Sequence, residues 1–211
     1  MTRKTVGFFC ALGAMTLGLL SSSALAEVTG GGVTGGTSGG SFQEIPPPMA
    51  VGPDAFDAPD LFAFDERQDV LLMAPAPIGP GVIAGPGSVL SSHYVAFDPL
   101  DPSRLIGFVD FDEPIVGILA GLQIGATNPL FGLPSVTYNG APAIGPDPMD
   151  SVMIDPTDPN RLLVDFGAGS PGDQLRVLTG VVVPEPAAWA LGWLGGLLAV
   201  GGRRGLGLGA A

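Results

Sequence analysis

The chain has 211 residues, 20 of them acidic and eight basic, and its formal net charge at pH 7 is −12. The segment from residue 27 to 183 is more acidic still, because nineteen acidic residues there face only four arginines, a net charge of −15. Such a surface repels phosphate backbones, so the composition excludes nucleic acid as a partner. The single cysteine, Cys10, excludes a disulfide framework.

The start of the chain has the three parts of a secretory signal peptide. Two basic residues lead into Val6–Leu20, which carries no charge. Small residues then occupy the two positions that signal peptidase reads, Ala24 and Ala26. We therefore predict a signal peptide over residues 1–26, which signal peptidase cleaves after Ala26. The alternative is an uncleaved anchor helix, for which the apolar segment is short.

Residues 27–60 are expected to form a flexible, Gly/Pro-rich linker. Gly30–Gly40 consists mostly of Gly, Thr and Ser, a composition typical of flexible coil. Pro46–Pro48 is a run of three prolines, which favours an extended polyproline conformation. The segment offers too little apolar surface to offset the entropy of ordering it.

Residues 61–183 change to short apolar runs, which Gly, Pro, Asp or Asn interrupts at short intervals. This spacing is typical of antiparallel strands, and no ten-residue window shows a helical period. We therefore predict an all-β ectodomain, an antiparallel, jelly-roll-like β-sandwich with one core. The expected strands are Leu61–Phe64, Val70–Met73, Ser88–Phe97, Arg104–Phe111, Ile115–Ile124, Ser135–Tyr138, Ser151–Asp155, Arg161–Phe166 and Gln174–Val183.

Two stretches of the ectodomain repeat one motif. Asp98–Arg104 and Asp155–Arg161 both read Asp-Pro-x-Asp-Pro-x-Arg, and each lies between two expected strands. Asp accepts local backbone hydrogen bonds and Pro fixes φ, so each motif is expected to form a rigid turn between paired strands. The flanking residues agree poorly, which favours two convergent turns over a tandem duplication.

The aspartates of these motifs are also candidate metal ligands. Ca²⁺ takes six to eight oxygen ligands, and the chain contains no EF-hand or nonapeptide calcium repeat. Turn formation by Asp before Pro accounts for these residues without a cofactor, and calcium binding is the alternative. The candidate calcium ligands are Asp98, Asp101, Asp155 and Asp158, with Asp110, Asp112 and Glu113 as a further acidic group.

His93 is the only histidine, and it stands in a strand pattern beside Ser91, Ser92 and Tyr94. A Ser-His-Asp triad is a spatial arrangement, so a single sequence does not exclude one. No Gly-x-Ser-x-Gly elbow accompanies this histidine. We therefore expect a partly buried structural histidine and no enzymatic activity.

The end of the chain has the parts of a membrane anchor. Pro184, Glu185 and Pro186 precede residues 187–202, which carry no charge and are followed by an arginine pair. Sixteen helical residues span about 24 Å, slightly less than the ~30 Å hydrocarbon core, and local thinning with snorkelling arginines closes the gap. We predict one transmembrane helix over residues 187–202, which Arg203 and Arg204 stop on the cytoplasmic side.

This C-terminal arrangement of motif, span and arginine pair, with a signal peptide at the other end, resembles the PEP-CTERM sorting tail. The resemblance covers residues 184–211 and implies a partner: exosortase, an integral-membrane cysteine protease-transpeptidase that processes such tails. It also implies a bacterium with an outer membrane and an exopolysaccharide matrix.

The middle of the chain resembles a recurrent ectodomain of PEP-CTERM proteins. The segments that carry this resemblance are Phe62–Glu66, Ser91–Val95, Gly107–Asp112, Pro171–Asp173 and Arg176–Thr179. By analogy, we expect an inner-membrane-anchored precursor that becomes a cell-surface or extracellular-matrix protein, structural or adhesive within an exopolysaccharide or biofilm layer. The alternative is a calcium- or carbohydrate-binding, lectin-like module.

Overall fold

The structure is a computed structural model, and it describes residues 26–140 and 145–183. These residues form fourteen strands and one short helix, so the fold class is all-β, as predicted. The predicted signal peptide and transmembrane helix lie almost wholly outside them. No helix in the described ranges is both long and apolar enough to cross a membrane.

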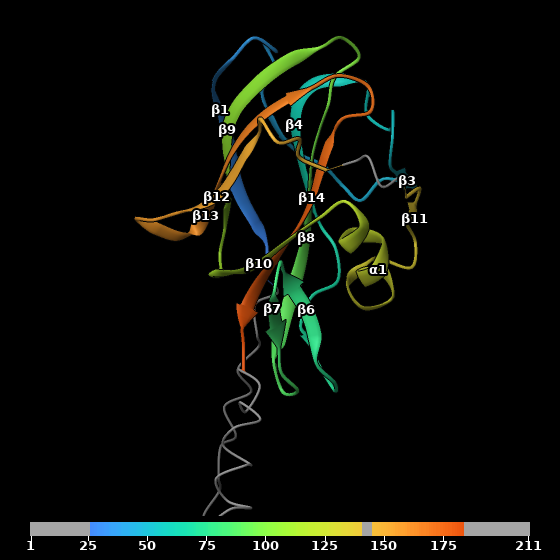
Figure 1. Cartoon of the computed structure of the whole chain (residues 1–211), viewed down its shortest axis with the longest axis vertical. Helices are drawn as coiled ribbons and strands as arrows, with labels where there is room; N and C mark the ends of the chain where they lie inside the picture. The colour runs from blue at the N-terminus through green and yellow to red at the C-terminus, as the bar shows by residue number, and fades with distance from the viewer. Residues whose placement is uncertain (1–25, 141–144, 184–211) are drawn as a thin grey trace, which may run out of the picture.

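Two large sheets make up most of the domain (Figure 1). The four-stranded sheet is antiparallel, in the order β1 (Val28–Gly36), β9 (Ser103–Phe111), β13 (Asp158–Ala168) and β12 (Ser151–Asp155). The six-stranded sheet has the order β10 (Ile115–Ala120), β14 (Asp173–Val181), β8 (Val89–Asp98), β4 (Ala58–Asp65) and β2 (Phe42–Glu44), with β5 (Val70–Leu71) also on β8. Only the β2–β4 pair is parallel in these sheets.

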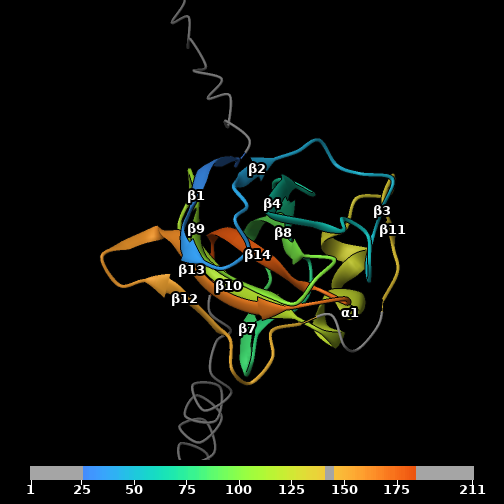
Figure 2. The ribbon, with the colours of Figure 1, turned by 90° about the horizontal axis from the view of Figure 1, so that it is seen from above.

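Two smaller pairs complete the strand inventory of the described chain. β3 (Ala50–Val51) pairs in parallel with β11 (Thr137–Tyr138), and β6 (Ala76–Gly79) forms an antiparallel hairpin with β7 (Val82–Ala84). Figure 2 shows helix α1 (Leu122–Phe131), with β3 and β11, on the side of the six-stranded sheet that faces away from the four-stranded one.

The main core lies between the two large sheets, because alternate residues of their strands point inward. Leu105, Val109 and Phe111 are buried along β9, as their alternation predicts, and so is Gly107. The residues between these positions, Ile106, Phe108 and Asp110, are partly or fully exposed. β13 follows the same pattern. β8 differs, since nine of its ten residues are buried. One face of β8 packs into the main core, and the other packs under α1 and the β3–β11 pair.

Each of the nine expected strands overlaps an observed strand. Two are only half as long as expected, since β5 ends at Leu71 and β11 begins at Thr137, and the last part of a third is not a strand at all. Residues 122–124, expected to extend a strand, belong to α1 instead. Apolar residues lie all around this helix, and the poor helix formers Gly125 and Pro129 lie within it, so the sequence carries no helical period to detect. Tertiary contacts therefore decide the conformation of this segment.

The prediction of a flexible linker over residues 27–60 is wrong, because most of this segment is part of the folded domain. β1, β2 and β3 all lie in it, and β1 pairs with β9 along its length. The glycines serve close packing, because a Cβ on Gly31 would lie 2.5 Å from the ring of Phe42, and one on Gly32 would lie 2.8 Å from the ring of Phe108. The glycine-rich composition thus reflects a strand covered by aromatic rings.

The repeated Asp-Pro motif forms a hairpin in only one of its two copies. β12 and β13 pair across the second copy, as predicted. The first copy joins β8 to β9, which belong to different sheets, so the predicted pairing is wrong there. The same local turn chemistry therefore serves both a hairpin and a connection between layers.

Candidate functional site

The candidate site surrounds a buried ion pair between Arg176 and Glu66. Arg176 lies in the middle of β14, and Glu66 directly follows β4. Arg176 Nε donates to Glu66 Oε2 at 2.6 Å, and Nη2 donates to Oε1 at 2.7 Å. Neither side chain is exposed to solvent. Burial opposes the charge on Arg176, but its hydrogen bonds to Glu66 and the attraction between the two charges raise its pKa overall.

The remaining donors of Arg176 hold helix α1 in place. Nη1 donates to the Ile124 carbonyl and to Thr127 Oγ1, each at 2.9 Å. Nη2 also donates to Asn128 Oδ1 at 2.9 Å. Three residues of the helix thus bond to one guanidinium, which satisfies a charge that would otherwise be buried without partners. These bonds explain how a helix of weak intrinsic preference is fixed on the sheet.

Tyr138 of β11 completes the network from the other side. Its hydroxyl donates to Glu66 Oε1 at 2.5 Å and accepts a hydrogen bond from the Leu133 N–H at 2.9 Å. The Arg176 guanidinium lies 5.3 Å from the centre of the Tyr138 ring. Burial and the nearby Glu66 carboxylate raise the pKa of Tyr138, so its hydroxyl stays protonated at neutral pH.

A pocket of 290 Å³ opens beside this network, between α1 and the β3–β11 pair. Tyr94 and Tyr138 supply aromatic rings, and Asn128 and Asn139 supply side-chain amides. Burial, followed by repulsion from Glu66, raises the pKa of Tyr94 as well. The lining therefore carries no charge at neutral pH, and it suits a small uncharged ligand.

His93 takes part in an acid–histidine–hydroxyl arrangement that the sequence did not place. Its Nδ1 lies 2.7 Å from Asp65 Oδ1, and its Nε2 lies 3.0 Å from Thr179 Oγ1. The hydroxyl is that of Thr179 and not that of Ser91 or Ser92. His93 and Thr179 are both fully buried, and the imidazole packs on Phe111. A substrate cannot reach either group in this structure, so the arrangement connects β4, β8 and β14.

The candidate calcium ligands Asp98 and Asp155 both bond to the chain itself. Asp98 is fully buried, and its two carboxylate oxygens accept hydrogen bonds from the backbone N–H groups of Phe56 and Gly172 at 2.9 and 3.0 Å. Asp155 Oδ1 accepts from the backbone and the hydroxyl of Thr157, a local turn.

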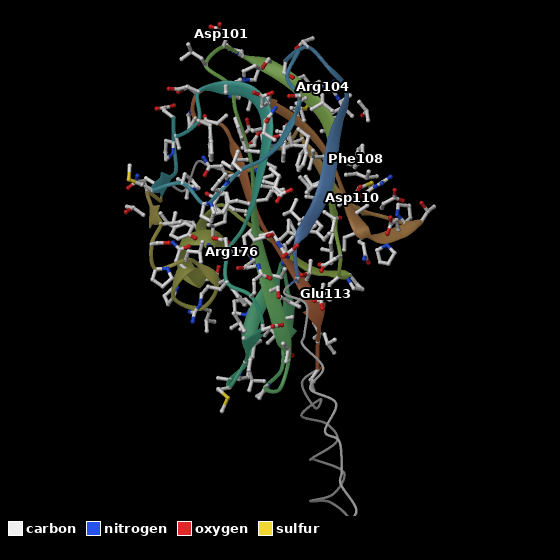
Figure 3. The ribbon with its side chains drawn as sticks, turned by 180° about the vertical axis from the view of Figure 1, so that it is seen from behind. Asp101, Arg104, Phe108, Asp110, Glu113 and Arg176 are labelled. Atoms are coloured by element: carbon white, nitrogen blue, oxygen red, sulfur yellow. The ribbon has the colours of Figure 1, made fainter. Side chains whose placement is uncertain are left out.

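The other candidate ligands do not join them. Asp158 Oδ1 accepts from the Asn160 N–H, and Asp101 is exposed at the opposite end of the domain from Glu113 (Figure 3). Asp110 forms a bidentate ion pair with Arg161. Within residues 26–140 and 145–183, no three acidic, histidine or cysteine side chains are placed to hold one metal ion. Calcium binding therefore stays a prediction without a located site.

A carboxylate pair that the sequence did not single out lies where β14 begins. Only 5% of the surface of Asp173 is exposed to solvent. This burial, together with repulsion from the nearby Asp150 and Asp147 carboxylates, raises the pKa of Asp173 to about 7. Asp150 accepts hydrogen bonds from the backbone N–H groups of Gly167 and Asp147 at 2.7 and 2.5 Å. Asp173 is therefore a proton-binding group in the neutral range.

The predicted processing signals fall mostly outside the described residues. This holds for Ala24, for the sorting motif Pro184, Glu185 and Pro186, and for the membrane stop Arg203 and Arg204. Ala26 is buried. The backbone N–H of Glu27, the first residue after the predicted cleavage position, donates to Asp112 Oδ1 at 2.8 Å, and Asp112 N–H donates back to the Glu27 carbonyl.

Sequence reasoning missed the pocket and the roles of Arg176 and Glu66. One signal was present: Arg176 stands alone among the apolar residues Leu175, Val177 and Leu178, where a charge requires a buried partner. Comparison of the chain with protein-family models, with curated proteins and with solved structures finds no match.

Proposed function

We propose that the protein is an exported surface or extracellular-matrix protein, made as a membrane-anchored precursor and processed at both ends. Signal peptidase removes residues 1–26, and an exosortase-like membrane protease acts at Pro184–Pro186. The predicted helix over residues 187–202 anchors the precursor until then. The domain is a jelly-roll-like β-sandwich with a structural or adhesive role in an exopolysaccharide layer.

The observation that carries this proposal is the direct junction between the folded domain and the proposed sorting tail. β14 ends at Val181, and the chain stays fixed to Val183, whose carbonyl accepts from Gly85 N–H at 2.8 Å and whose N–H donates to Ser88 Oγ at 2.9 Å. Pro184 is the next residue. A two-sheet domain is thus attached to the motif without a spacer, which fits a cargo that a membrane protease delivers.

The charge of the domain supports an extracellular polymer layer as its destination. With a net charge of −15 over residues 27–183, molecules of this protein repel one another and stay dispersed. The candidate site adds no accessible catalytic group, since the histidine arrangement is buried. A role in binding or spacing matrix polymers therefore accounts for more of the observations than a reaction does.

Cell fractionation tests the proposal. Cells of a matrix-forming bacterium that has an exosortase would express either the intact chain or a chain ended after Val183. We expect the intact chain to pass from the membrane fraction to the cell surface or matrix, and the shortened chain to be released without attachment. Equal distribution of the two chains would contradict the proposal.

The pocket beside α1 favours a second candidate function, a lectin-like module. Its uncharged lining with two tyrosines and two asparagines suits one neutral sugar ring. Thermal unfolding of the purified protein with neutral monosaccharides, and separately with millimolar Ca²⁺, tests this function. A rise in the unfolding temperature with a monosaccharide that Tyr138→Ala removes, or a rise with Ca²⁺, would support it, whereas no response to any addition would contradict it.

A further inference from the structure

One end of the folded domain is covered with exposed aliphatic side chains. Seven of the fifteen exposed large hydrophobic residues in the described chain lie there, so nearly half of them gather on a small part of the surface. They come from β5, β7, the start of β8 and the end of β14, or directly follow these strands. We call this set the aliphatic end: Leu71, Met73, Val82, Ile83, Val89, Val181 and Val183.

Strand register and hydrogen bonds join these residues into one surface. Leu71 and Val181 are both register partners of Val89, so three neighbouring strands present a row of aliphatic side chains. Two hydrogen bonds hold Val183 against the turn that follows β7, and Leu72 bonds to the same turn. Figure 1 shows β6, β7 and the end of β14 together at this end of the domain.

The aliphatic end is uncharged in an otherwise acidic domain. Residues 70–90 and 177–183 contain no Asp, Glu, Lys or Arg. On the side of the folded domain, the carboxylate nearest in sequence is that of Asp69, which precedes Leu71 by two residues, or roughly 7 Å along a strand. On the other side, Glu185 follows Val183 by two residues in the connection to the proposed membrane helix. Burial, followed by repulsion from neighbouring acids, raises the pKa of Glu113, which lies toward the same end (Figure 3). The outermost layer of the domain at this end, about 7 Å deep, can therefore move from water into an apolar environment without burying a charged side chain.

The chain itself determines what this surface faces. Val183 is the last described residue, and only Pro184, Glu185 and Pro186 separate it from the proposed membrane helix that starts at Ala187. Four residues of extended chain span at most about 14 Å. In the anchored precursor the aliphatic end is therefore held within that distance of the bilayer.

We propose that the aliphatic end rests in the interfacial layer of the bilayer that holds the chain's own C-terminal helix. This inference rests on the proposed function, because it requires residues 187–202 to be a membrane anchor. Interfacial elements bury their apolar face about 5–10 Å deep, which matches the uncharged depth of this end. Exposed apolar patches of this kind mark surfaces that contact a partner or a membrane. The contact keeps Pro184–Pro186 at the level of the lipid headgroups, where a membrane-embedded protease reaches it.

Fluorescence quenching by brominated lipid tests the contact. The full chain would carry Cys10→Ala and a single new cysteine, either Val82→Cys in the aliphatic end or Leu100→Cys at the opposite end. Both positions are exposed, at 49% and 67%, so a polarity-sensitive thiol probe reacts with each. The labelled proteins would be reconstituted into neutral phosphatidylcholine vesicles with or without bromine on the acyl chains, and flotation would show which chains bind the vesicles.

We expect bromine to quench the probe at position 82 at least about twofold and to leave the probe at position 100 unchanged, since quenching requires contact with the acyl chains. If the chain floats with the vesicles but neither probe is quenched, the aliphatic end stands clear of the bilayer and this inference is wrong. If the full chain floats no better than one ended after Val183, the proposed anchor is wrong as well. A blue shift of the position-82 probe when an unlabelled second protein copy is added, without vesicles, would assign the surface to self-association and overturn the inference.

Discussion

Arg176 and Glu66 lie 110 residues apart in the chain and form a bidentate ion pair from which solvent is fully excluded. Both oxygens of the carboxylate and all five N–H groups of the guanidinium have hydrogen-bond partners. Removing one partner of such a buried ion pair strongly destabilises the folded protein, because the other charge stays buried without a counterion. The pair joins α1, β4, β11 and β14, so its loss affects all four elements.

Glu66→Gln should therefore destabilise the protein by about 3–5 kcal/mol. The change keeps the shape of the side chain but leaves the Arg176 charge without a counterion. Urea unfolding of the purified protein, followed by circular dichroism, measures the free energy of unfolding directly. Asp165→Asn is the matched control, since the Arg104–Asp165 pair has the same bidentate geometry on the surface, where such pairs contribute about 1 kcal/mol or less. Equal losses in the two variants would contradict the role assigned to the buried pair.

Asp98 and Asp155 occupy the same position in the two copies of the repeated motif, yet their replacement should have unequal effects. Asp98→Ala removes two hydrogen bonds from backbone N–H groups, one buried and one partly buried, and should cost roughly 3 kcal/mol. Asp155→Ala removes two hydrogen bonds within one exposed turn, both from Thr157, and should cost about 0.5 kcal/mol. The unfolding temperatures of the two variants, measured in the same buffer, test whether Asp98→Ala is the more destabilising change. A larger fall in the unfolding temperature for Asp155→Ala than for Asp98→Ala would contradict the stabilising role given to the buried carboxylate of Asp98.

The raised pKa of Asp173 predicts a specific dependence of stability on pH. The folded state binds a proton at Asp173 with a pKa of about 7, whereas an unfolded chain binds it with a pKa of about 3.9. The folded state therefore binds more protons between these values, and its stability falls as the pH rises from about 4 to about 7. Asp173→Asn should remove this fall and stabilise the protein at pH 8, by about 4 kcal/mol at most.

Thermal unfolding at pH 4, 6 and 8 measures this effect. Asp101→Asn is the control, because Asp101 is exposed and should leave the pH dependence of the wild-type protein unchanged. Parallel curves for wild type and Asp173→Asn would refute the assignment of the titration to Asp173.

Cleavage after Ala26 should place the new N-terminal ammonium of Glu27 against the Asp112 carboxylate. The backbone nitrogen of Glu27 already lies 2.8 Å from Asp112 Oδ1. An exposed ion pair of this kind should slow acylation of the mature N-terminal amine about two- to fivefold relative to Asp112→Asn. Mass spectrometry after timed labelling with acetic anhydride measures the rate. The same rate in both proteins would show that the amine does not pair with Asp112.

Most of the strand order along the chain could be predicted from alternation and turn residues. Leu162, Val164 and Phe166 alternate with residues that are partly exposed, and the structure buries them as expected. The pattern was readable because the four-stranded sheet has one apolar face. β8 is buried on both faces and was still predicted as a strand, although Ser91, Ser92 and His93 interrupt its apolar residues.

Features that depend on distant contacts were not readable. The glycine-rich sequence of β1 predicts a coil, because the contacts of its glycines with the rings of Phe42 and Phe108 form only in the folded domain. Helix α1 lacks an apolar stripe and depends on bonds from Arg176. The candidate site was missed for the same reason, since Glu66 and Tyr138 meet Arg176 only after three separate segments fold. Glu66 and Arg176 nevertheless lie in two of the segments that carry the ectodomain resemblance, Phe62–Glu66 and Arg176–Thr179.

The central claim is that this chain is an exported precursor cut at both ends, and the intact mass of the mature protein tests it most directly. The protein would be purified from the surface fraction of cells that carry an exosortase, and its mass would be measured without digestion. The account predicts a species that begins at Glu27 and ends within or close to Pro184–Pro186. A mature species that keeps residues 187–211 would contradict it.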